Sequence, residues 1–344
     1  MRDRVPVSGS FDLTYRCNLR CVHCYCGHLT AQTASQAAEL STAGVQRLLA
    51  EAAEAGLLSL VLSGGEPLLR SDFVTIYDGA CRLGLLTTVF TNATLVDDHI
   101  VAALREYPPQ MVEVSMYGAT DAVYERVTGV RGSYVRAMRG IQRLMDAGVR
   151  VGLKSMVLRD NVEDIPAMLK IADELGVSFR SDALVTPRLD GDQGPLEQRV
   201  DPVRAAELEL LAEKSRRDAA AYRDRRMAAD ESPDLYQCGA GSMGFHLDPA
   251  GGLRPCIMSQ EYAFDAVGLG FAPAWKALVR ALDGLRLQQD SLCPECNWRA
   301  LCGYCPGLLA LETGSVHGHS PYMCSLGERR SGIIGENLEA MSNE

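Results

Sequence analysis

The sequence predicts an α/β protein: a partial, TIM-like (β/α)6 barrel followed by a small Cys-rich C-terminal domain. Two observations predict the barrel. Short apolar segments alternate with amphipathic helical segments from residue 10 to about residue 185, and the alternation occurs six times. This order is typical of a parallel sheet with helices outside it. Six units rather than eight predict a barrel that is open on one side. A third observation, seven cysteines between residues 238 and 324, predicts the second domain.

The six predicted strands are rich in Val and Leu, as strands with two buried faces are. They are SFDLTY (10–15), LLSLVLSGG (57–65), LLTTVFTN (85–92), MVEVSMYG (111–118), VRVGLKSMV (149–157) and VSFRSDALV (177–185). The helical segments between them, such as STAGVQRLLAEAAEAG and SYVRAMRGIQRLMDAGV, end near a glycine that fits a helix C-cap. We therefore place the barrel domain at residues 1–195.

The rest of the chain divides into three parts. Residues 196–235 are highly charged and predict a bridge of one or two exposed helices. Residues 236–330 are rich in Cys, Gly and Pro, with one clear helix at 271–284, and form the Cys-rich domain. Residues 331–344 are expected to be a C-terminal tail. A small, loop-rich module with seven cysteines is expected to depend on bound metal for its fold.

Composition excludes several classes of protein. The formal net charge is −10 and the pI is about 5.2, which argues against a nucleic-acid-binding protein. No run of roughly 18 apolar residues and no signal-peptide-like segment occurs, so we expect no membrane association and a cytoplasmic location. Thiols stay reduced in that compartment, so clustered cysteines are expected to be metal ligands.

Four cysteines lie within ten residues of one another, at positions 17, 21, 24 and 26. Cys17 follows the first predicted strand, so CNLRCVHC is the first βα loop, where parallel α/β folds bind ligands. Three thiolates spaced C-X3-C-X2-C can bind one [4Fe–4S] cluster and leave its fourth iron open. Two alternatives remain: zinc bound by three thiolates and His23, or a closed cluster with Cys26 as its fourth ligand.

The segment CNLRCVHCY resembles the signature of the radical S-adenosylmethionine (SAM) enzymes. The resemblance implies that Cys17, Cys21 and Cys24 are the catalytic cysteines and hold a [4Fe–4S] cluster. Its open iron would bind the amino and carboxylate groups of SAM. Reductive cleavage of SAM would then give a 5′-deoxyadenosyl radical, which abstracts a hydrogen atom from the substrate.

The same resemblance implies a set of residues that bind SAM. Gly64-Gly65-Glu66-Pro67, at the end of the second strand, matches the family's GGEP segment: the glycines would let the backbone approach the methionine moiety, and Glu66 would accept from its ammonium. By itself this stretch also fits a helix start with Pro at the first position. The other implied contacts are Tyr25 at the adenine, Thr91 and Asn92, Ser115 at the ribose, and Lys154 at the methionine carboxylate.

The seven later cysteines follow a second pattern. Cys238 and Cys256 give C-X12-G-X4-C, and CPECNWRALCGYC gives C-X2-C-X5-C-X2-C before a last cysteine at 324. A zinc ribbon of Cys293, Cys296, Cys302 and Cys305 is one interpretation. The whole order resembles the SPASM module, which holds two auxiliary iron–sulfur clusters in many radical SAM enzymes.

By that resemblance, the nearer auxiliary cluster is held by Cys238, Cys256 and Cys305, and the farther one by Cys293, Cys296, Cys302 and Cys324. The chain would thus carry three [4Fe–4S] clusters. It departs from the family pattern in one place, because two residues rather than three separate Cys302 and Cys305. The fourth position of the nearer cluster is open, taken by substrate, or filled by Cys26 or a non-cysteine group.

SPASM enzymes mostly modify ribosomally made peptides, so the resemblance implies a radical SAM oxidoreductase that forms a cross-link or another oxidised bond in a precursor peptide. The alternative substrate is a small molecule, such as a porphyrin-like or sugar intermediate. Formylglycine formation is disfavoured, because Ile257-Met258-Ser259 follows Cys256 where that subgroup has an Asp. A non-enzymatic zinc or electron-transfer protein is the third hypothesis.

The resemblance also implies partners. The barrel begins by about residue 10, so we expect leader-peptide recognition by a separate small protein or by the barrel itself. An electron donor such as flavodoxin or ferredoxin is required for reductive cleavage. Pocket residues without an assigned role are expected at His23, His28, Tyr117, Tyr124 and Asp182.

Overall fold

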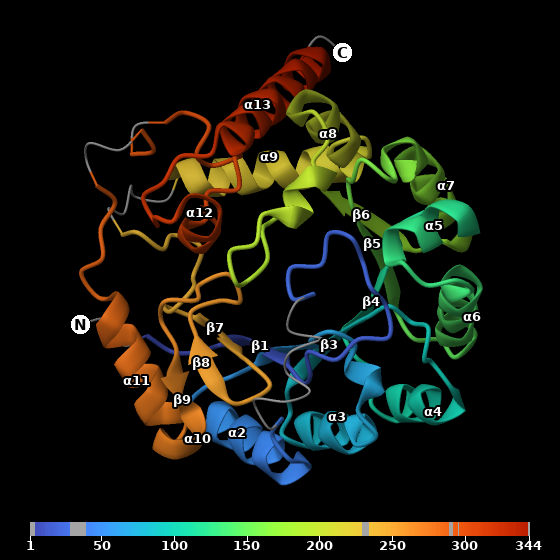
Figure 1. The fold of residues 1–344 in the computed structure, drawn as a ribbon, viewed down its shortest axis with the longest axis vertical. Helices are drawn as coiled ribbons and strands as arrows, with labels where there is room; N and C mark the ends of the chain where they lie inside the picture. The colour runs from blue at the N-terminus through green and yellow to red at the C-terminus, as the bar shows by residue number, and fades with distance from the viewer. Residues whose placement is uncertain (1–3, 28–38, 229–233, 289–291, 295, 343–344) are drawn as a thin grey trace.

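The computed structural model describes residues 4–27, 39–228, 234–288, 292–294 and 296–342, and a curved sheet of nine strands lies at its centre (Figure 1). The strand order is β6-β5-β4-β3-β2-β1-β7-β8-β9, so the first six strands are neighbours in chain order. Each adjacent pair among them is parallel. They are β1 (Ser8–Asp12), β2 (Ser59–Ser63), β3 (Leu86–Thr91), β4 (Met111–Ser115), β5 (Val151–Met156) and β6 (Ser178–Asp182). The predicted partial barrel is confirmed.

Helices cover the outside of these strands (Figure 1). They are α2 (Thr42–Glu54), α3 (Phe73–Arg82), α4 (Asp98–Glu106), α5 (Asp121–Thr128), α6 (Ser133–Asp146) and α7 (Ile165–Leu175), with short 3-10 turns η1 (Pro67–Leu69) and η2 (Val162–Asp164). Local sequence fixes their ends. The Ser41 side chain accepts from the Gly44 N–H at the start of α2, and Gly129 and Gly176 end α5 and α7 in the left-handed conformation.

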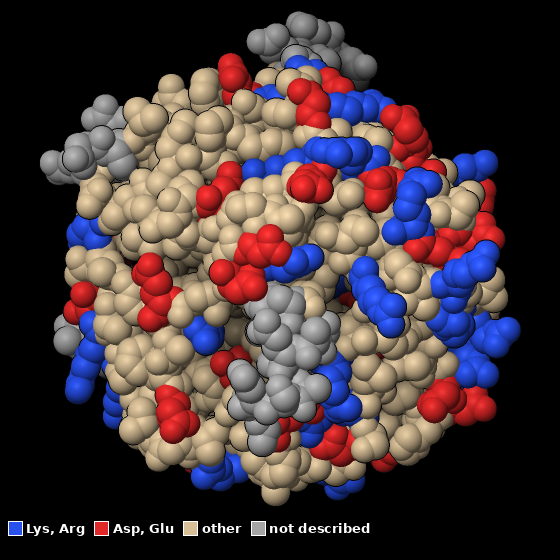
Figure 2. Space-filling view, in the orientation of Figure 1, with Lys and Arg blue, Asp and Glu red and all other residues tan. Residues whose placement is uncertain are grey.

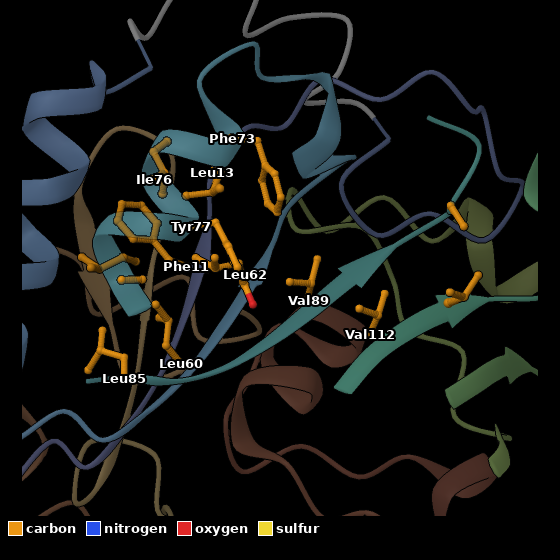
Figure 3. Close-up of a cluster of buried hydrophobic side chains, with 14 of the residues drawn as sticks. Phe11, Leu13, Leu60, Leu62, Phe73, Ile76, Tyr77, Leu85, Val89 and Val112 are labelled. Atoms are coloured by element: carbon orange, nitrogen blue, oxygen red, sulfur yellow. The ribbon is translucent and has the colours of Figure 1, made fainter. Parts of the chain in front are cut away.

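The barrel's apolar core lies between the outer face of the sheet and the helices (Figure 3). Phe11, Leu60 and Leu62 on the strands meet Phe73 and Tyr77 on α3, and all five are buried. Complete burial of such side chains stabilises the fold by about 1.5–3 kcal/mol each. Because successive strand residues point to opposite faces, the alternate positions face the barrel interior and are free to carry polar groups.

The predicted bridge contains η3 (Gly194–Gln198), α8 (Pro202–Glu209) and α9 (Glu213–Ala228). The prediction of exposed helices fits α9, which is mostly exposed, but it is wrong for α8. Ala205, Ala206 and Leu208 of α8 are buried, and the helix packs against α13 (Pro321–Ser342). Because this stretch contains many charged residues, the apolar face of α8 was not identified from the sequence.

The Cys-rich region extends the barrel sheet. Its strand β7 (Gly244–Leu247) pairs in parallel with β1, and β8 (Gly252–Arg254) and β9 (Phe264–Asp265) follow antiparallel. Its helices are α10 (Ala266–Leu269), α11 (Phe271–Leu282), α12 (Pro306–Thr313) and α13. The helix expected at 271–284 is confirmed as α11. No described helix is long and apolar enough to cross a membrane.

Three helices of this region were not predicted: the short α10, α12 and α13. The α12 sequence PGLLALET is apolar on all sides, so it lacks an amphipathic period. Three glycines, at 327, 332 and 335, interrupt the pattern of α13. Residues 331–342, which we expected to be a tail, are the second half of that helix.

Candidate active site at the barrel mouth

The loop with the first three cysteines starts directly after β1 and crosses one end of the barrel (Figure 1). Backbone hydrogen bonds fix it to the end of α5: the Arg20 N–H donates to the Thr128 carbonyl at 2.8 Å, and the Val22 N–H donates to the Val127 carbonyl at 3.0 Å. Cys17, Cys21 and Cys24 are partly buried. We call residues 17–24 the cluster loop.

The thiols of the cluster loop interact electrostatically. The pKa of Cys17 is raised to about 11, chiefly by burial, and the nearby charges of Glu66 and Cys24 contribute to this rise. The pKa of Cys21 is raised well above its usual value. Burial is the largest cause, and the charges of Cys24 and Cys17 are the next largest. The Cys24 pKa is lowered to about 7, chiefly because the Cys26 thiol hydrogen-bonds to it at 3.7 Å. If these buried groups were all thiolates, their negative charges would need a cationic partner.

An iron–sulfur cluster fits this donor set, since its irons supply the positive charge and bind thiolates. Among the described residues, no group of three or more His, Cys, Asp or Glu side chains is arranged to hold a single metal ion. The His23 ring packs edge-on against Tyr117, with ring centroids 4.6 Å apart, and burial lowers the His23 pKa to about 4. Cys26 is buried beside Cys24, and its ligand role stays untested.

The GGEP segment lies against the start of the cluster loop. The Gly65 N–H donates to the Thr14 carbonyl at 2.7 Å, and the Glu66 N–H donates to the Arg16 carbonyl at 2.9 Å. A Cβ atom on Gly64, whose φ is 135°, would lie 2.2 Å from the Thr14 carbonyl oxygen. A Cβ atom on Gly65 would lie 2.4 Å from the Arg16 carbonyl oxygen. The two glycines therefore let two loops of this chain meet, which adds to the role that we predicted for them toward methionine.

Glu66 connects β2 to β3 from a fully buried position. Its carboxylate accepts from the Thr91 hydroxyl at 2.7 Å, the Asn92 N–H at 2.7 Å and the Leu68 N–H at 3.2 Å. Burial raises its pKa to about 7 in spite of these donors. A carboxylate has about four lone-pair sites, so an ammonium could still be accepted. Pro67 begins η1 directly after it.

Asn92 joins the end of β3 to the cluster loop. Its Nδ2 group donates to Asn18 Oδ1 at 2.9 Å and lies 4.0 Å from the Cys17 sulfur. Its Oδ1 atom accepts from the Thr94 hydroxyl at 2.6 Å, and Thr94 in turn accepts from Asn18. This network holds the first cysteine relative to β3.

Lys154 projects from β5 next to an aromatic ring and a carboxylate. Its Nζ atom lies 3.0 Å from the centre of the Phe90 ring and 3.6 Å from Glu113 Oε2. Burial lowers the Lys154 pKa to about 7. Glu113 also pairs with Arg180 at 2.6 Å. Lys154 therefore has partners within the chain, and its predicted contact with methionine stays a prediction.

Two other predicted SAM contacts lie nearby. Tyr25 follows Cys24, and its carbonyl accepts from the Leu189 N–H at 2.9 Å. Burial raises the pKa of Tyr25 well above its usual value. Ser115 ends β4 and is paired with Lys154 of the neighbouring strand β5. Of the pocket residues without assigned roles, Tyr124 is buried and Asp182 partly buried, whereas His28 lies outside the described residues.

A buried Asp–His pair was missed by the sequence analysis. Asp12 ends β1 and His246 lies on β7, with 3.8 Å between Asp12 Oδ2 and His246 Nε2. His246 Nδ1 is 2.9 Å from the Ser10 hydroxyl, whereas the two facing atoms have no hydrogen-bond partner. Burial raises the Asp12 pKa to about 8 and lowers the His246 pKa to about 3. The position of Asp12, at the end of a strand just before the cluster loop, was the feature of the sequence that could have identified this pair.

The seven later cysteines interact in two groups. The Cys256 pKa is raised to about 12, chiefly by burial, and Cys305 and Cys238 contribute to this rise. Burial also raises the Cys302 pKa to about 12, and the other contributing thiols are Cys324, Cys296 and Cys293. The groups therefore contain Cys238, Cys256 and Cys305, and Cys293, Cys296, Cys302 and Cys324. Thiols that interact in two such groups fit iron–sulfur ligation.

Comparison with known proteins supports the interpretation of the first half of the chain as a radical SAM domain. Residues 11–172 match the radical SAM superfamily. Fe-coproporphyrin III synthase of Methanosarcina barkeri is 33% identical over 173 residues, which are 50% of this chain and 42% of that protein. PqqA peptide cyclase of Gluconobacter oxydans is 34% identical over 171 residues, which are 50% of this chain and 47% of that protein.

Two comparisons extend further along the chain. Mycofactocin maturase MftC of Mycobacterium ulcerans is 28% identical over 309 residues, covering 86% of this chain and 82% of that protein. The structure of Streptococcus suis SuiB bound to precursor peptide SuiA is similar in fold, with a TM-score of 0.70 and 18% identity over 93% of this chain and 76% of that chain.

The chain spans about half the length of the first two relatives. The segment that matches the radical SAM superfamily, residues 11–172, contains the cluster loop, the GGEP segment and the strand ends around them. Residues 11–172 therefore form a radical SAM domain.

Proposed function

We propose that this chain is a radical SAM enzyme that forms a cross-link or another oxidised bond in a ribosomally synthesised precursor peptide. The observation that carries the proposal is the set of three interacting, buried thiols of the cluster loop beside the GGEP segment. The relatives named as a peptide cyclase and a mycofactocin maturase support a peptide as substrate.

In this mechanism Cys17, Cys21 and Cys24 would hold a [4Fe–4S] cluster. That group supplies the electron that cleaves SAM and so generates the 5′-deoxyadenosyl radical. The chain's own groups fix the geometry. Asn92 and Asn18 orient the loop that carries Cys17, while Glu66 ties β2 to β3 beneath it. Rigid positioning of this kind keeps the radical close to the substrate hydrogen and away from other groups.

SAM would be bound by residues at the carboxyl ends of the strands, where parallel barrels place their ligands. We assign this role to Gly64, Gly65, Glu66, Pro67, Tyr25, Asn92, Ser115 and Lys154. The buried Glu66 carboxylate is the acceptor proposed for the ammonium of the methionine moiety. Lys154 lies on β5, beside Ser115 of β4, and is the proposed partner of the carboxylate of the methionine moiety.

The two later groups of cysteines would hold two auxiliary [4Fe–4S] clusters, which makes three clusters in all. Cys238, Cys256 and Cys305 would bind the nearer one, and Cys293, Cys296, Cys302 and Cys324 the farther one. The neighbouring thiols that contribute to the raised pKa values of Cys256 and Cys302 follow the same division and support this assignment. A separate leader-peptide-binding protein and an electron donor complete the proposed system, and a cytoplasmic location suits its reduced thiols.

A small-molecule substrate is the second candidate, because Fe-coproporphyrin III synthase is among the relatives. The test is to incubate the anaerobically reconstituted enzyme with SAM, a reductant and one substrate at a time. The substrates are a short precursor peptide encoded beside the gene, with its leader-binding protein if one is encoded, and iron-coproporphyrin III. Mass spectrometry should show the peptide, and not the porphyrin, losing two hydrogen masses per bond formed. Conversion of the porphyrin alone would overturn the peptide proposal.

A further inference from the structure

Five exposed arginines form a positive patch on the outer wall of the barrel, over α5, α6 and the cluster loop. They are Arg20, Arg126, Arg131, Arg136 and Arg139. Figure 2 shows Lys and Arg side chains gathered on the right-hand flank, where Figure 1 places α5 and α6. The whole chain has a net charge of −10, so the patch has the opposite sign to the molecule. We call these five residues the arginine patch.

The charges of the arginine patch are not neutralised within the described parts of the chain. The Arg126 guanidinium donates to the Asp160 carbonyl at 2.6 Å, a neutral partner. None of the five arginines forms an ion pair with a described carboxylate. The adjacent Glu125 carboxylate accepts from the Gly132 N–H at 2.7 Å and keeps its negative charge at the edge of the patch, without an ion pair to any of the five arginines. The patch is therefore available to a negatively charged partner.

The arginine patch is continuous with the cluster loop. Arg20 lies between two of its cysteines and is exposed, and its backbone N–H is hydrogen-bonded to Thr128 at the end of α5. The next residue along, Gly129, is so close that a Cβ atom there would lie 3.0 Å from the Arg20 carbonyl oxygen. Arg131 follows two residues later. Arg20 on the cluster loop is thus next to the end of α5, and Arg131 follows in the connection to α6.

An exposed apolar residue belongs to the same surface. Val135 is 56% exposed at the first turn of α6 and is next to Arg136 in sequence. An exposed apolar residue beside charged ones can contribute to a protein-binding surface. A peptide substrate would instead be expected at the inner ends of the strands, where the proposed SAM ligands lie.

We propose that the arginine patch docks an acidic, low-potential electron-transfer protein, which delivers its electron through the cluster loop. The proposal rests on the proposed function, because reductive cleavage of SAM consumes one electron that must come from outside the chain. One electron leaves the docked protein, which is oxidised, and enters the cluster held by the cluster loop, which is reduced. No bond is made or broken in this step. Positive charge beside the entry point steers the acidic donor to the correct face.

The test compares two charge reversals on opposite sides of the molecule. Arg136→Glu/Arg139→Glu changes two exposed charges of the patch, and Lys276→Glu/Arg280→Glu changes two exposed charges on α11. The probe is a purified flavodoxin of net negative charge. Its dissociation constant for the reconstituted enzyme is measured at low and high salt, without SAM or peptide. The rate of cluster reduction is then measured with reduced flavodoxin and with dithionite, which needs no docking site.

We expect the patch variant to weaken flavodoxin binding about tenfold or more at low salt, with the difference shrinking above about 0.1 M salt. The α11 variant should bind like the wild type, and dithionite should reduce all three proteins equally. Equal effects of the two reversals, or none, would overturn the proposal. If the patch variant lost precursor-peptide binding with an unchanged flavodoxin constant, the patch would be a peptide site instead. Absence of peptide conversion in the wild type would count only against the proposed function.

Discussion

Asp12 and His246 face each other across the boundary between the barrel and the Cys-rich region, with 3.8 Å between Asp12 Oδ2 and His246 Nε2. Asp12 ends the strand that leads into the cluster loop, and His246 lies on the strand paired with it. Burial raises the pKa of the acid to about 8 and lowers the pKa of the imidazole to about 3. Both groups are therefore largely uncharged near pH 7, and a buried pair of this kind makes stability depend on pH.

The first prediction concerns Asp12→Asn. The folded state binds a proton at Asp12 more tightly than the unfolded state does, since its pKa rises from 3.8 to about 8. Asp12 therefore disfavours folding increasingly as pH rises from about 4 to 8, by at most about 5 kcal/mol. The Asp12→Asn variant should have the same free energy of unfolding as the wild type near pH 4 and a larger one near pH 8. Anaerobic urea unfolding at both pH values measures this.

The control for this prediction is Asp173→Asn, which changes an exposed carboxylate on α7. It should leave the pH dependence of the free energy of unfolding unchanged. An Asp12→Asn effect of the same size at pH 4 and pH 8 would show that Asp12 does not titrate between them.

A second prediction concerns Glu66→Gln. An amide has one oxygen and one NH2 group, so it cannot accept from both Thr91 and Asn92 as the carboxylate does. One buried donor loses its partner, which should cost about 1–3 kcal/mol and displace the ends of β2 and β3. We expect the affinity for SAM to fall about tenfold, measured by equilibrium dialysis. The exposed Glu54→Gln on α2 is the control, and equal SAM affinities in both variants would contradict the assigned role.

The third prediction compares two glycines with positive φ. Gly64→Ala places a Cβ atom 2.2 Å from the Thr14 carbonyl oxygen, whereas Gly148→Ala has no atom within 4 Å. Backbone strain alone should cost Gly148→Ala about 1–3 kcal/mol. Gly64→Ala must also push apart the GGEP segment and the cluster loop, so it should lose cluster iron as well as stability. Iron content and thermal unfolding measure both effects, and normal iron in Gly64→Ala would refute this packing argument.

A fourth prediction separates the two cysteine regions. Cys17→Ala should abolish the formation of 5′-deoxyadenosine, because the cluster that reduces SAM is lost. Cys324→Ala should retain part of this cleavage but lose the modified product. Cys81→Ala, on α3 and packed against the core, should retain both activities. Chromatography of 5′-deoxyadenosine and of the substrate measures the two reactions. Cleavage at the wild-type rate in Cys17→Ala would end the proposed mechanism.

The barrel was predictable because its strands and helices repeat one simple pattern, from Ser8–Asp12 to Ser178–Asp182. Motif residues such as Glu66 were found because they and their neighbours in the sequence form a recognisable motif, here GGEP. Asp12 and His246 were missed because they are 234 positions apart and only the pairing of β1 with β7 brings them together. The same pairing shows that the Cys-rich region continues the barrel sheet, which no local pattern indicates. The buried face of α8 was hidden because its partner, α13, lies more than 100 residues later.

The most direct test of the account is the iron and sulfide content of anaerobically prepared protein, for wild type and for the variant Cys17→Ala/Cys21→Ala/Cys24→Ala. The account predicts about twelve irons and about twelve sulfides per wild-type chain, and about eight of each in the variant, because one of three [4Fe–4S] clusters is lost. Two or three zinc ions per chain without sulfide would show that the thiolates are structural, and would contradict the radical mechanism.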